Sequence, residues 1–450
     1  MFILSLAYIA SFFYYIKGLR LKEPERIAIF YIAGMSIYTI ALSTTMQFTS
    51  ADVVNVIKYF KEIAIGTCFA YLLFTEYENI KLNTLDWLII ILFTYCAFYV
   101  IIPAGNFTTL EKIIVFKSYG LFGPLYFIGR WMPIKNISAE KITHWIIGIL
   151  VCASIVQFVE VIFYQHLQSY SGYTAYNQKI NQLYSSGSFG LTQTFETDLG
   201  NKRFASFFQD PLDFAISLVL GICLTIGWLL FGDDKKVSKK IKWLVLFVLL
   251  FALYQTYSRA SMLGAAIAIL YYVFITNKKS FIKYSLLVLF FVLIYIYFSE
   301  NEKTRNYIID TILFRESSAL SHLLAWLGGI EAMIEQPFGL GLGSSGIYAF
   351  GDGLGIGGEN HLIFMGVQTG IISLSRYLVI FIYIWILLSK NWKRFSGYEK
   401  IIALGLLLFK AGSLIPMLTS YFESFLFMSY LTWFLTGYLT SHIEWRKNTA

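Results

Sequence analysis

Residues 241–276 read IKWLVLFVLLFALYQTYSRASMLGAAIAILYYVFIT, two apolar runs joined by a short polar stretch that contains Arg259. An apolar run of about 20 residues is long enough to cross a bilayer as a helix. Similar runs follow one another along most of the chain, near 2–17, 27–46, 59–76, 84–103, 112–130, 141–163, 211–232, 241–257, 259–276, 280–298, 361–389, 398–415 and 420–440. The sequence therefore predicts an all-α polytopic membrane protein with about 13 transmembrane helices, within a range of about 12 to 14.

The composition supports the same fold class. Of the 450 residues, 57% are hydrophobic and only 14% are charged, and the mean hydropathy is +0.63. No boundary of a soluble domain is visible, so residues 1–450 are expected to form a single integral membrane domain. The net charge of +8 is explained by lysines and arginines in the joints between apolar runs, and nucleic-acid binding is not expected.

The distribution of basic residues predicts how the chain is oriented. Lysines and arginines collect in alternate joints, near 17–26, 235–242, 278–279 and 390–394, and such joints are typically cytoplasmic. The N-terminus and the two long polar segments, 164–210 and 299–360, are then predicted to be extracytoplasmic. The second segment is expected to contain an amphipathic helix at 320–336, which Pro337 ends.

A glycine-rich stretch follows that helix. Gly341, Gly343 and Gly346 have the spacing G-x-G-x-x-G of a dinucleotide-binding loop, but that motif requires a preceding strand within a βαβ unit. No such unit is visible, so the nucleotide interpretation is rejected. The glycines predict instead a closely packed turn with positive φ, before the chain re-enters the membrane at 359–361.

Several ionisable residues are predicted to share the outer face. Arg259 is the most informative, because an arginine between two apolar spans must be solvated, paired or bound to an anion. Snorkelling to phospholipid headgroups is one explanation; a site for a lipid-linked phosphate is the other, since guanidinium groups fit phosphate oxygens. No D-x-D triplet lies on this face, so neither a metal nor another cofactor is indicated. The candidates are Arg203, Arg259, Arg315, His322, Glu359 and His361.

Three patches between about 200 and 380 resemble the O-antigen polymerase and O-antigen ligase superfamily. They are KRFASFFQDPLDFA at 202–215, TYSRASMLG at 256–264, and HLLAWLGGIEAMIEQPFGLGLGSSG at 322–346 with ENHLIFMGVQTGIISL at 359–374. The resemblance implies a GT-C-like helical bundle with two large extracytoplasmic loops. It also implies a metal-independent glycosyltransferase of the bacterial cytoplasmic (inner) membrane, whose active site faces the periplasm and whose donor is an undecaprenyl-diphosphate-linked glycan.

The resemblance also implies roles for the candidate residues. Arg203 and Arg259, with Arg315 or His322, would neutralise the departing diphosphate; Glu359 or His361 would deprotonate the acceptor hydroxyl, and Asn360 would orient a sugar hydroxyl or the loop. Family members often have His-Asn where this chain has Glu359-Asn360, and often have Arg in place of His322. We favour Glu359 over His361 as the base, because it occupies the position of the family's histidine.

Three functions are compatible with these features. A polymerase of lipid-linked repeat units is favoured; a ligase that transfers finished glycan to a lipid or protein acceptor is the main alternative, and a polysaccharide transporter or flippase is the third. The expected partners are undecaprenyl-diphosphate-linked oligosaccharides and membrane lipids. A chain-length regulator and a flippase of the same pathway are further partners that the resemblance implies.

Overall fold

The computed structural model describes residues 2–76, 78, 80–132, 137–197, 200–232, 237–276, 315, 317–346 and 356–449. The span predicted at 280–298 lies outside these residues. So do residues 299–314 and 347–355, which belong to the second predicted external segment.

The described residues form helices and no strand; one isolated antiparallel bridge joins Glu196 and Lys202. The longer helices are α1 (Phe2–Leu21), α3 (Met35–Phe48), α5 (Phe60–Thr75), α6 (Thr84–Ile101), α7 (Thr109–Gly120), α8 (Phe122–Trp131), α9 (Ala139–Phe163), α12 (Pro211–Phe231), α13 (Lys239–Gln255), α14 (Arg259–Thr276), α17 (Ser317–Glu335), α18 (His361–Asn391), α19 (Gly397–Gly412) and α21 (Leu426–Thr449). Shorter ones are α2 (Pro24–Ile29), α4 (Ala51–Lys58), α10 (Leu167–Tyr170), α11 (Tyr173–Tyr176) and α20 (Leu414–Thr419). The π-helices are Phe30–Gly34 and Asn177–Asn181, and the 3-10 turns are Gln193–Phe195, Trp392–Arg394 and Phe422–Ser424.

Seven of the described helical segments are long and apolar enough to cross a membrane: Phe2–Leu21, Pro24–Phe48, Thr84–Ile101, Ala139–Phe163, Pro211–Phe231, Arg259–Thr276 and His361–Arg394. The all-α, multi-pass character of the protein is therefore confirmed. The spans predicted at 59–76, 241–257 and 398–415 fold as the shorter helices α5, α13 and α19. The total of about 13 spans stays a prediction.

Two predicted spans differ from the structure. The single span predicted at 112–130 is divided into α7 and α8 at Leu121. Pro124 explains the break, because it has no N–H to donate to the carbonyl of Gly120. The span predicted at 420–440 begins only at Leu426, because the preceding residues form a turn that places the buried carboxylate of Glu423 inside the bundle.

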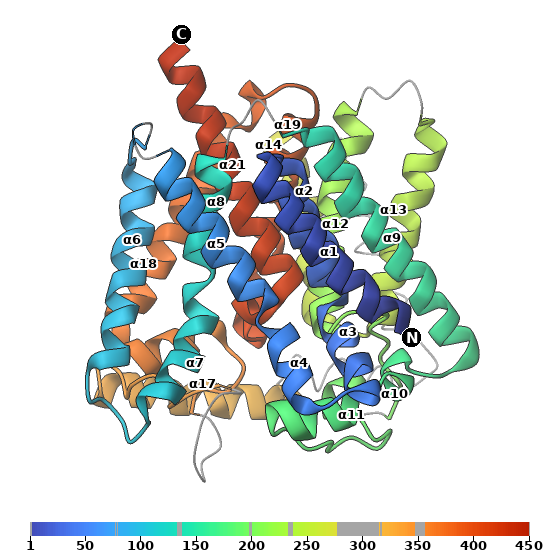
Figure 1. Ribbon diagram of the computed structural model, residues 1–450, viewed down its shortest axis with the longest axis vertical. Coiled ribbons are helices and arrows are strands. Elements are labelled where there is room, and N and C mark those ends of the chain that lie inside the picture. Colours follow the sequence, from blue (N-terminus) through green and yellow to red (C-terminus); the bar gives the residue numbers. More distant parts are fainter. Residues whose placement is uncertain are drawn as a thin grey trace.

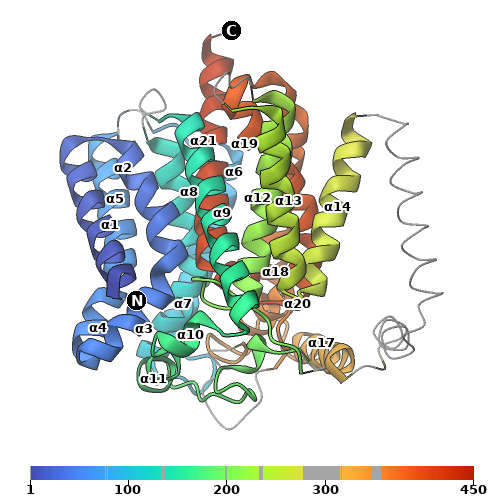
Figure 2. The ribbon, with the colours of Figure 1, turned by 90° about the vertical axis from the view of Figure 1, so that its right-hand side faces the viewer.

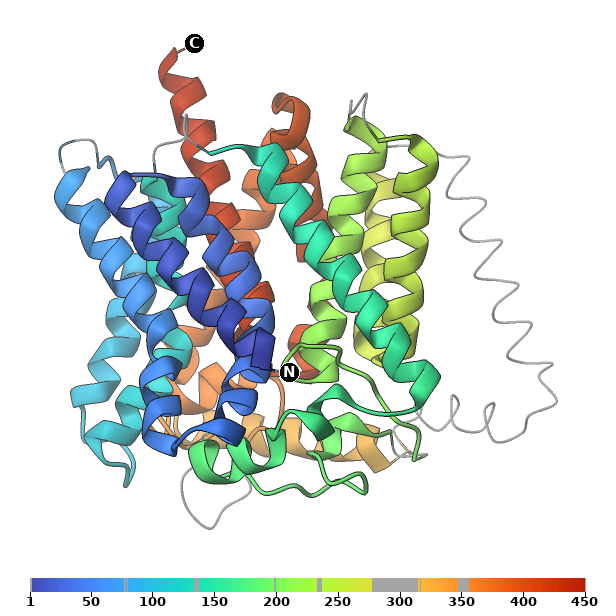
Figure 3. The same cartoon turned by 45° about the vertical axis from the view of Figure 1, so that its right-hand side comes forward.

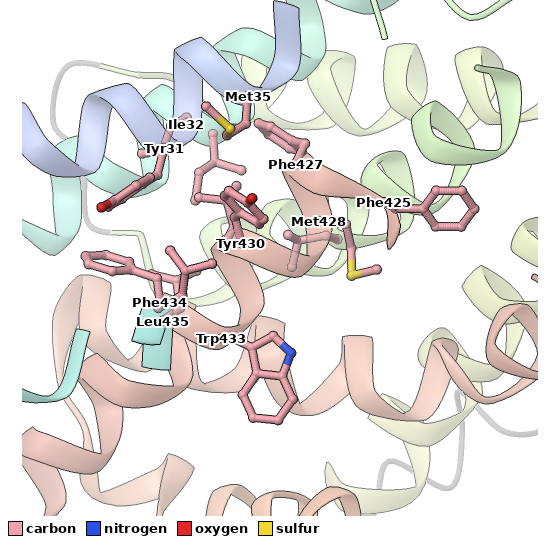
Figure 4. Packing of buried hydrophobic residues seen from close by; sticks show 14 of the residues in the cluster. Tyr31, Ile32, Met35, Phe425, Phe427, Met428, Tyr430, Trp433, Phe434 and Leu435 are labelled. Atoms are coloured by element: carbon pink, nitrogen blue, oxygen red, sulfur yellow. The ribbon is translucent and has the colours of Figure 1, made fainter. Parts of the chain in front are cut away.

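The last long helix lies in the middle of the core. In Figure 4 the α21 residues Tyr430 and Phe434 lie beside Tyr31 of the N-terminal helices, and the rings of Tyr31 and Phe434 are 6.3 Å apart. On another side of α21, the indole Nε1 of Trp433 donates a hydrogen bond to Glu423 Oε2 at 2.9 Å. Apolar contacts and a satisfied buried carboxylate therefore both hold α21 in place.

The two ends of the bundle differ. Figure 1 shows the N-terminus, α4, α10, α11 and α17 at one end and the C-terminus at the other. Figure 2 shows α17 lying across the direction of the long helices, and in Figure 3 the segment 164–210, in green, runs along the same end. The basic residues Lys17 and Arg20 belong to the far end of α1. By the positive-inside rule, the end that carries α17 is predicted to be extracytoplasmic, and this orientation stays a prediction.

Candidate functional site

The segment around Arg203 is fixed to the end of α9 by buried polar side chains. Glu160 accepts hydrogen bonds from the backbone N–H of Leu167 at 2.7 Å and of Ser206 at 2.8 Å. Gln168 Nε2 donates to the carbonyls of Ser206 at 2.8 Å and Phe208 at 3.1 Å. These bonds satisfy backbone groups of an irregular segment and so give it one defined position.

Arg203 joins this segment to the joint between α13 and α14. Its Nε donates to the backbone carbonyl of Thr256 at 3.0 Å, and Thr256 precedes Arg259 by three residues. Arg259 is exposed and is the first residue of α14. The structure therefore brings the first two sequence patches together at one end of the bundle.

Asp210 is a site residue that the sequence reasoning missed. It caps α12, where its carboxylate accepts from the backbone N–H of Leu212 at 2.8 Å and of Asp213 at 3.0 Å. Burial raises the pKa of Asp210, while these hydrogen bonds and the charge of Arg203 lower it. The available signal was Asp before Pro211, a pattern typical of the start of a helix.

Glu359 lies within electrostatic range of both residues. Its side chain is half-buried, and burial raises its pKa above the ordinary value for glutamate. The charge of Asp210 raises the pKa of Glu359 further, and the charge of Arg203 lowers it. We call Arg203, Asp210 and Glu359 the outer charged cluster. Two carboxylates and one guanidinium group thus influence one another in a partly desolvated environment, which makes Glu359 a stronger proton acceptor than an ordinary glutamate.

Tyr421 is the second residue that the sequence reasoning missed. Burial and the charge of Glu359 both raise the pKa of the Tyr421 hydroxyl, so this hydroxyl stays protonated and able to donate. Its ring lies 5.4 Å from that of Phe364. No local sequence signal marks Tyr421, because it is brought to the cluster from the turn before α21 only by folding.

A tight turn and a helix cap position Glu359. Gly357 and Gly358 have φ values of +91° and +58°, and a Cβ on Gly329 of α17 would lie 2.7 Å from Gly357 Cα. Asn360 Oδ1 accepts from the backbone N–H of Leu362 at 3.0 Å and Ile363 at 3.2 Å, which caps α18. The helix across the outer end therefore supports the turn that carries Glu359, and the amide of Asn360 stabilises the backbone beside it.

His361 faces a different environment. Its side chain is buried, its ring centroid lies 5.0 Å from that of Tyr377, and neither ring nitrogen has a hydrogen-bond partner among the described residues. The Tyr377 hydroxyl donates to Glu423 Oε1 at 2.6 Å. The ring of His361 thus packs against other aromatic rings, whereas Glu359 lies within electrostatic range of Asp210 and Arg203.

The remaining two candidates belong to the region of α17. Arg315 is exposed just before this helix, and His322 is half-buried in its second turn. Their relation to the outer charged cluster, and the convergence of Arg259 on it, stay predictions.

The glycine-rich stretch forms the closely packed turn that the sequence predicted. Gly341, Gly343 and Gly346 have φ values of +102°, +100° and +83°. The backbone N–H of Gly343 donates to Gln368 Oε1 at 2.8 Å, so the protein itself uses a donor that a dinucleotide loop would offer to phosphate. The turn fixes the chain between α17 and α18.

Comparison with known families supports the resemblance that the sequence patches indicated. Residues 244–364 match a family model, Wzy_C, described as O-antigen ligase. This stretch includes Arg259, Glu359, Asn360 and His361, while Arg203 lies before it. No curated protein sequence matches the chain. The match confirms the resemblance that the motifs indicated: over residues 244–364 the chain is similar to the O-antigen polymerase and ligase superfamily of glycosyltransferase and ligase-type enzymes.

Proposed function

We propose that this protein is a metal-independent glycosyltransferase that polymerises undecaprenyl-diphosphate-linked oligosaccharide repeat units. The product would be a surface polysaccharide: O-antigen, capsule or exopolysaccharide. The reaction would take place on the outer face of the bacterial cytoplasmic membrane. Support comes from the multi-pass helical fold, the family match over residues 244–364, and the position of the outer charged cluster at the end assigned to the outside.

The observation that carries the proposal is the environment of Glu359. This carboxylate is half-buried and lies within electrostatic range of Arg203, and its pKa is raised. A general base works best when its pKa is close to the operating pH, and a cation beside it can stabilise a departing anion. One small group of residues thus supplies both functions that transfer from a lipid diphosphate requires.

The reaction can be written with these residues. Glu359 takes the proton of an acceptor sugar hydroxyl, and the acceptor oxygen attacks C1 of the donor sugar. A new glycosidic C–O bond forms while the bond between C1 and the phosphate oxygen breaks. Undecaprenyl diphosphate leaves with the electron pair of that bond, and Arg203 and Arg259 neutralise its charge. Asn360 holds the backbone beside Glu359 in place.

A ligase is the second candidate, and the description of the matched family model favours it. A ligase would use the same chemistry but transfer a finished glycan to a lipid or protein acceptor. The two functions differ in the acceptor, which the outer charged cluster does not define.

The test uses purified protein in lipid nanodiscs with a synthetic undecaprenyl-diphosphate-linked repeat unit. A polymerase produces a ladder of longer glycans that remain attached to undecaprenyl diphosphate, without any added acceptor. A ligase produces no ladder and transfers glycan only when a separate acceptor, such as lipid A core, is supplied. Folded protein that is inactive in both assays contradicts the proposed function.

A further inference from the structure

We propose that Lys58, Lys61 and Lys117 form a second site on the outer side of the bundle, which binds the diphosphate of the acceptor glycolipid. We call these residues the lysine site. The inference rests on the proposed function, because joining two lipid-linked repeat units requires two lipid diphosphates to be held at once. The outer charged cluster accounts for one of them.

The three lysines come from adjoining elements, and two of them bind the carboxylate of Glu62. Lys58 ends α4, and Lys61 and Glu62 lie in the first turn of α5. Glu62 Oε1 accepts from Lys61 Nζ at 3.0 Å and from Lys117 Nζ of α7 at 2.8 Å. Lys58 Nζ donates to Asn181 Oδ1 at 3.1 Å. The site therefore connects the N-terminal helices to the first external segment.

The charges at this place do not balance. Lys61 and Lys117 bind Glu62, and Lys58 lies within electrostatic range of all three. These four described side chains carry three ammonium groups and one carboxylate, an excess of about two positive charges. Lys61 is buried, and the side chains of Lys117 and Glu62 are only 29% and 16% exposed. Burial lowers the pKa of Lys58 to about 8, and the charges of Lys117 and Lys61 contribute to this decrease. A partly desolvated excess of positive charge is costly unless an anion compensates it.

The surroundings indicate that the anion is attached to a lipid. Val56 of α4, Tyr59 at the junction with α5, and Ile63 of α5 are 63%, 53% and 47% exposed. These apolar side chains flank the lysines on the outer side of the bundle, where a lipid-linked headgroup would reach them. In Figure 1, α4 lies at the same end as α17. A diphosphate carries enough negative charge to balance the excess, and its lipid chain would lie along the exposed faces of α4 and α5.

The site is independent of the region that matches the family model. All three lysines lie in the N-terminal part of the chain, outside residues 244–364. Aromatic rings complete the site: Lys61 Nζ is 5.1 Å from the ring centroid of Tyr38, and Lys117 Nζ is 5.5 Å from that of Tyr59. Such rings orient ammonium groups without adding negative charge, so they do not reduce the excess positive charge that Glu62 leaves.

The experiment counts bound undecaprenyl diphosphate by native mass spectrometry of the full chain released from nanodiscs. The wild-type protein is expected to bind two molecules. Lys58→Gln should weaken one of the two binding events about tenfold, the loss expected for one charge-assisted hydrogen bond. Lys58→Gln combined with Lys117→Gln should leave one molecule bound. Lys58→Arg should retain both, and Lys179→Gln, which removes an exposed lysine of the neighbouring external segment, is the matched control.

Competitors identify the source of the phosphate. Inorganic pyrophosphate should displace the molecule that depends on Lys58, which supports recognition of the diphosphate itself. If phosphatidylglycerol occupies the lysine site and undecaprenyl diphosphate does not displace it, the site serves a phospholipid headgroup and the proposal is overturned. Unchanged binding of two molecules by the double variant also overturns it.

Failure of this inference can be distinguished from failure of the proposed function. The binding count requires no transfer, so it tests the lysine site even in an inactive preparation. Transfer from a lipid-linked repeat unit tests the function even if the lysine site is absent. Arg203→Gln should lose the other bound molecule, which assigns each molecule to its own site.

Discussion

Arg203 Nε donates a hydrogen bond to the backbone carbonyl of Thr256 at 3.0 Å. This bond joins the segment that follows α9, predicted to be external, to the short joint between α13 and α14. The first two sequence patches that resemble the family, 202–215 and 256–264, are therefore in direct contact. The bond through Nε fixes the orientation of the planar guanidinium group.

We predict that Arg203→Gln lowers kcat by about 10² to 10³, the loss typical of removing one group that stabilises a departing anion. Arg203→Lys should recover only part of this loss, because lysine keeps the charge but cannot donate from Nε. Single-turnover transfer from a synthetic lipid-linked repeat unit measures both variants. Lys179→Gln removes an exposed charge from the same external segment and should leave kcat unchanged. Equal activity of Arg203→Gln and wild type would exclude Arg203 from the reaction.

Paired substitutions distinguish whether Glu359 or His361 is the general base. Glu359→Gln keeps the shape of the side chain and removes the base, so turnover should fall by about 10² to 10⁴. His361 is buried beside Tyr377, so His361→Gln should lower the yield of folded protein more than the turnover of what folds. Folded protein is quantified by size-exclusion chromatography in detergent, and transfer is normalised to it. An inactive but folded His361→Gln alongside an active Glu359→Gln would reverse the assignment.

The pH dependence of transfer should report the raised pKa of Glu359. A general base acts only when deprotonated, so kcat/KM should rise with pH through this pKa, and at a higher pH than an ordinary glutamate would give. Asp210→Asn keeps an oxygen that can cap α12 but removes the charge that raises the pKa of Glu359. The acidic limb of the profile should therefore move to lower pH.

A substitution that removes a positive charge near Glu359 is the control for that shift. Removing the positive charge with Arg203→Gln should move the acidic limb to higher pH, because Arg203 lowers the pKa of Glu359. The profile of this variant is measured on its residual activity. If the acidic limbs of both variants coincide with that of the wild type, another group is the base.

The sequence predicted the parts of the fold that depend on local patterns. Apolar runs revealed the long helices, and the glycines at 341, 343 and 346 revealed a turn with positive φ. The break at Pro124 was a local signal that the hydropathy of 112–130 concealed. Asp210 and Tyr421 could not be found in this way, because their proximity to Glu359 depends on how separate helices pack. Glu359 and His361 are two residues apart, a spacing that does not put side chains on one helix face, but the sequence alone could not show which of them would lie within range of Arg203.

The glycine turn offers a test of packing that is independent of activity. Gly341 has φ +102°, and a Cβ there would contact the carbonyl of Ala104. Gly341→Ala should therefore cost more than the roughly 1–2 kcal/mol of a left-handed backbone alone. Gly190→Ala is the matched control, because Gly190 has φ +73° and a Cβ on it would meet no heavy atom within 4 Å. Thermal unfolding in detergent should show a larger decrease in Tm for Gly341→Ala, and equal decreases would contradict the packing argument.

The orientation of the bundle is tested by cysteine labelling in intact cells. Ser186 is exposed in the first external segment, and Ser396 is exposed between the basic stretch near 390–394 and α19. With the assigned topology, a membrane-impermeant maleimide should label Ser186→Cys in intact cells and Ser396→Cys only after permeabilisation. The background is a variant in which the four native cysteines are replaced, since Cys152 is exposed on α9. Each labelled variant must retain transfer activity, which shows that the accessibility of the cysteine is measured in a folded protein. Labelling of Ser396→Cys in intact cells, with Ser186→Cys protected, would place the outer charged cluster and the lysine site in the cytoplasm, where a polymerase of exported repeat units could not use them.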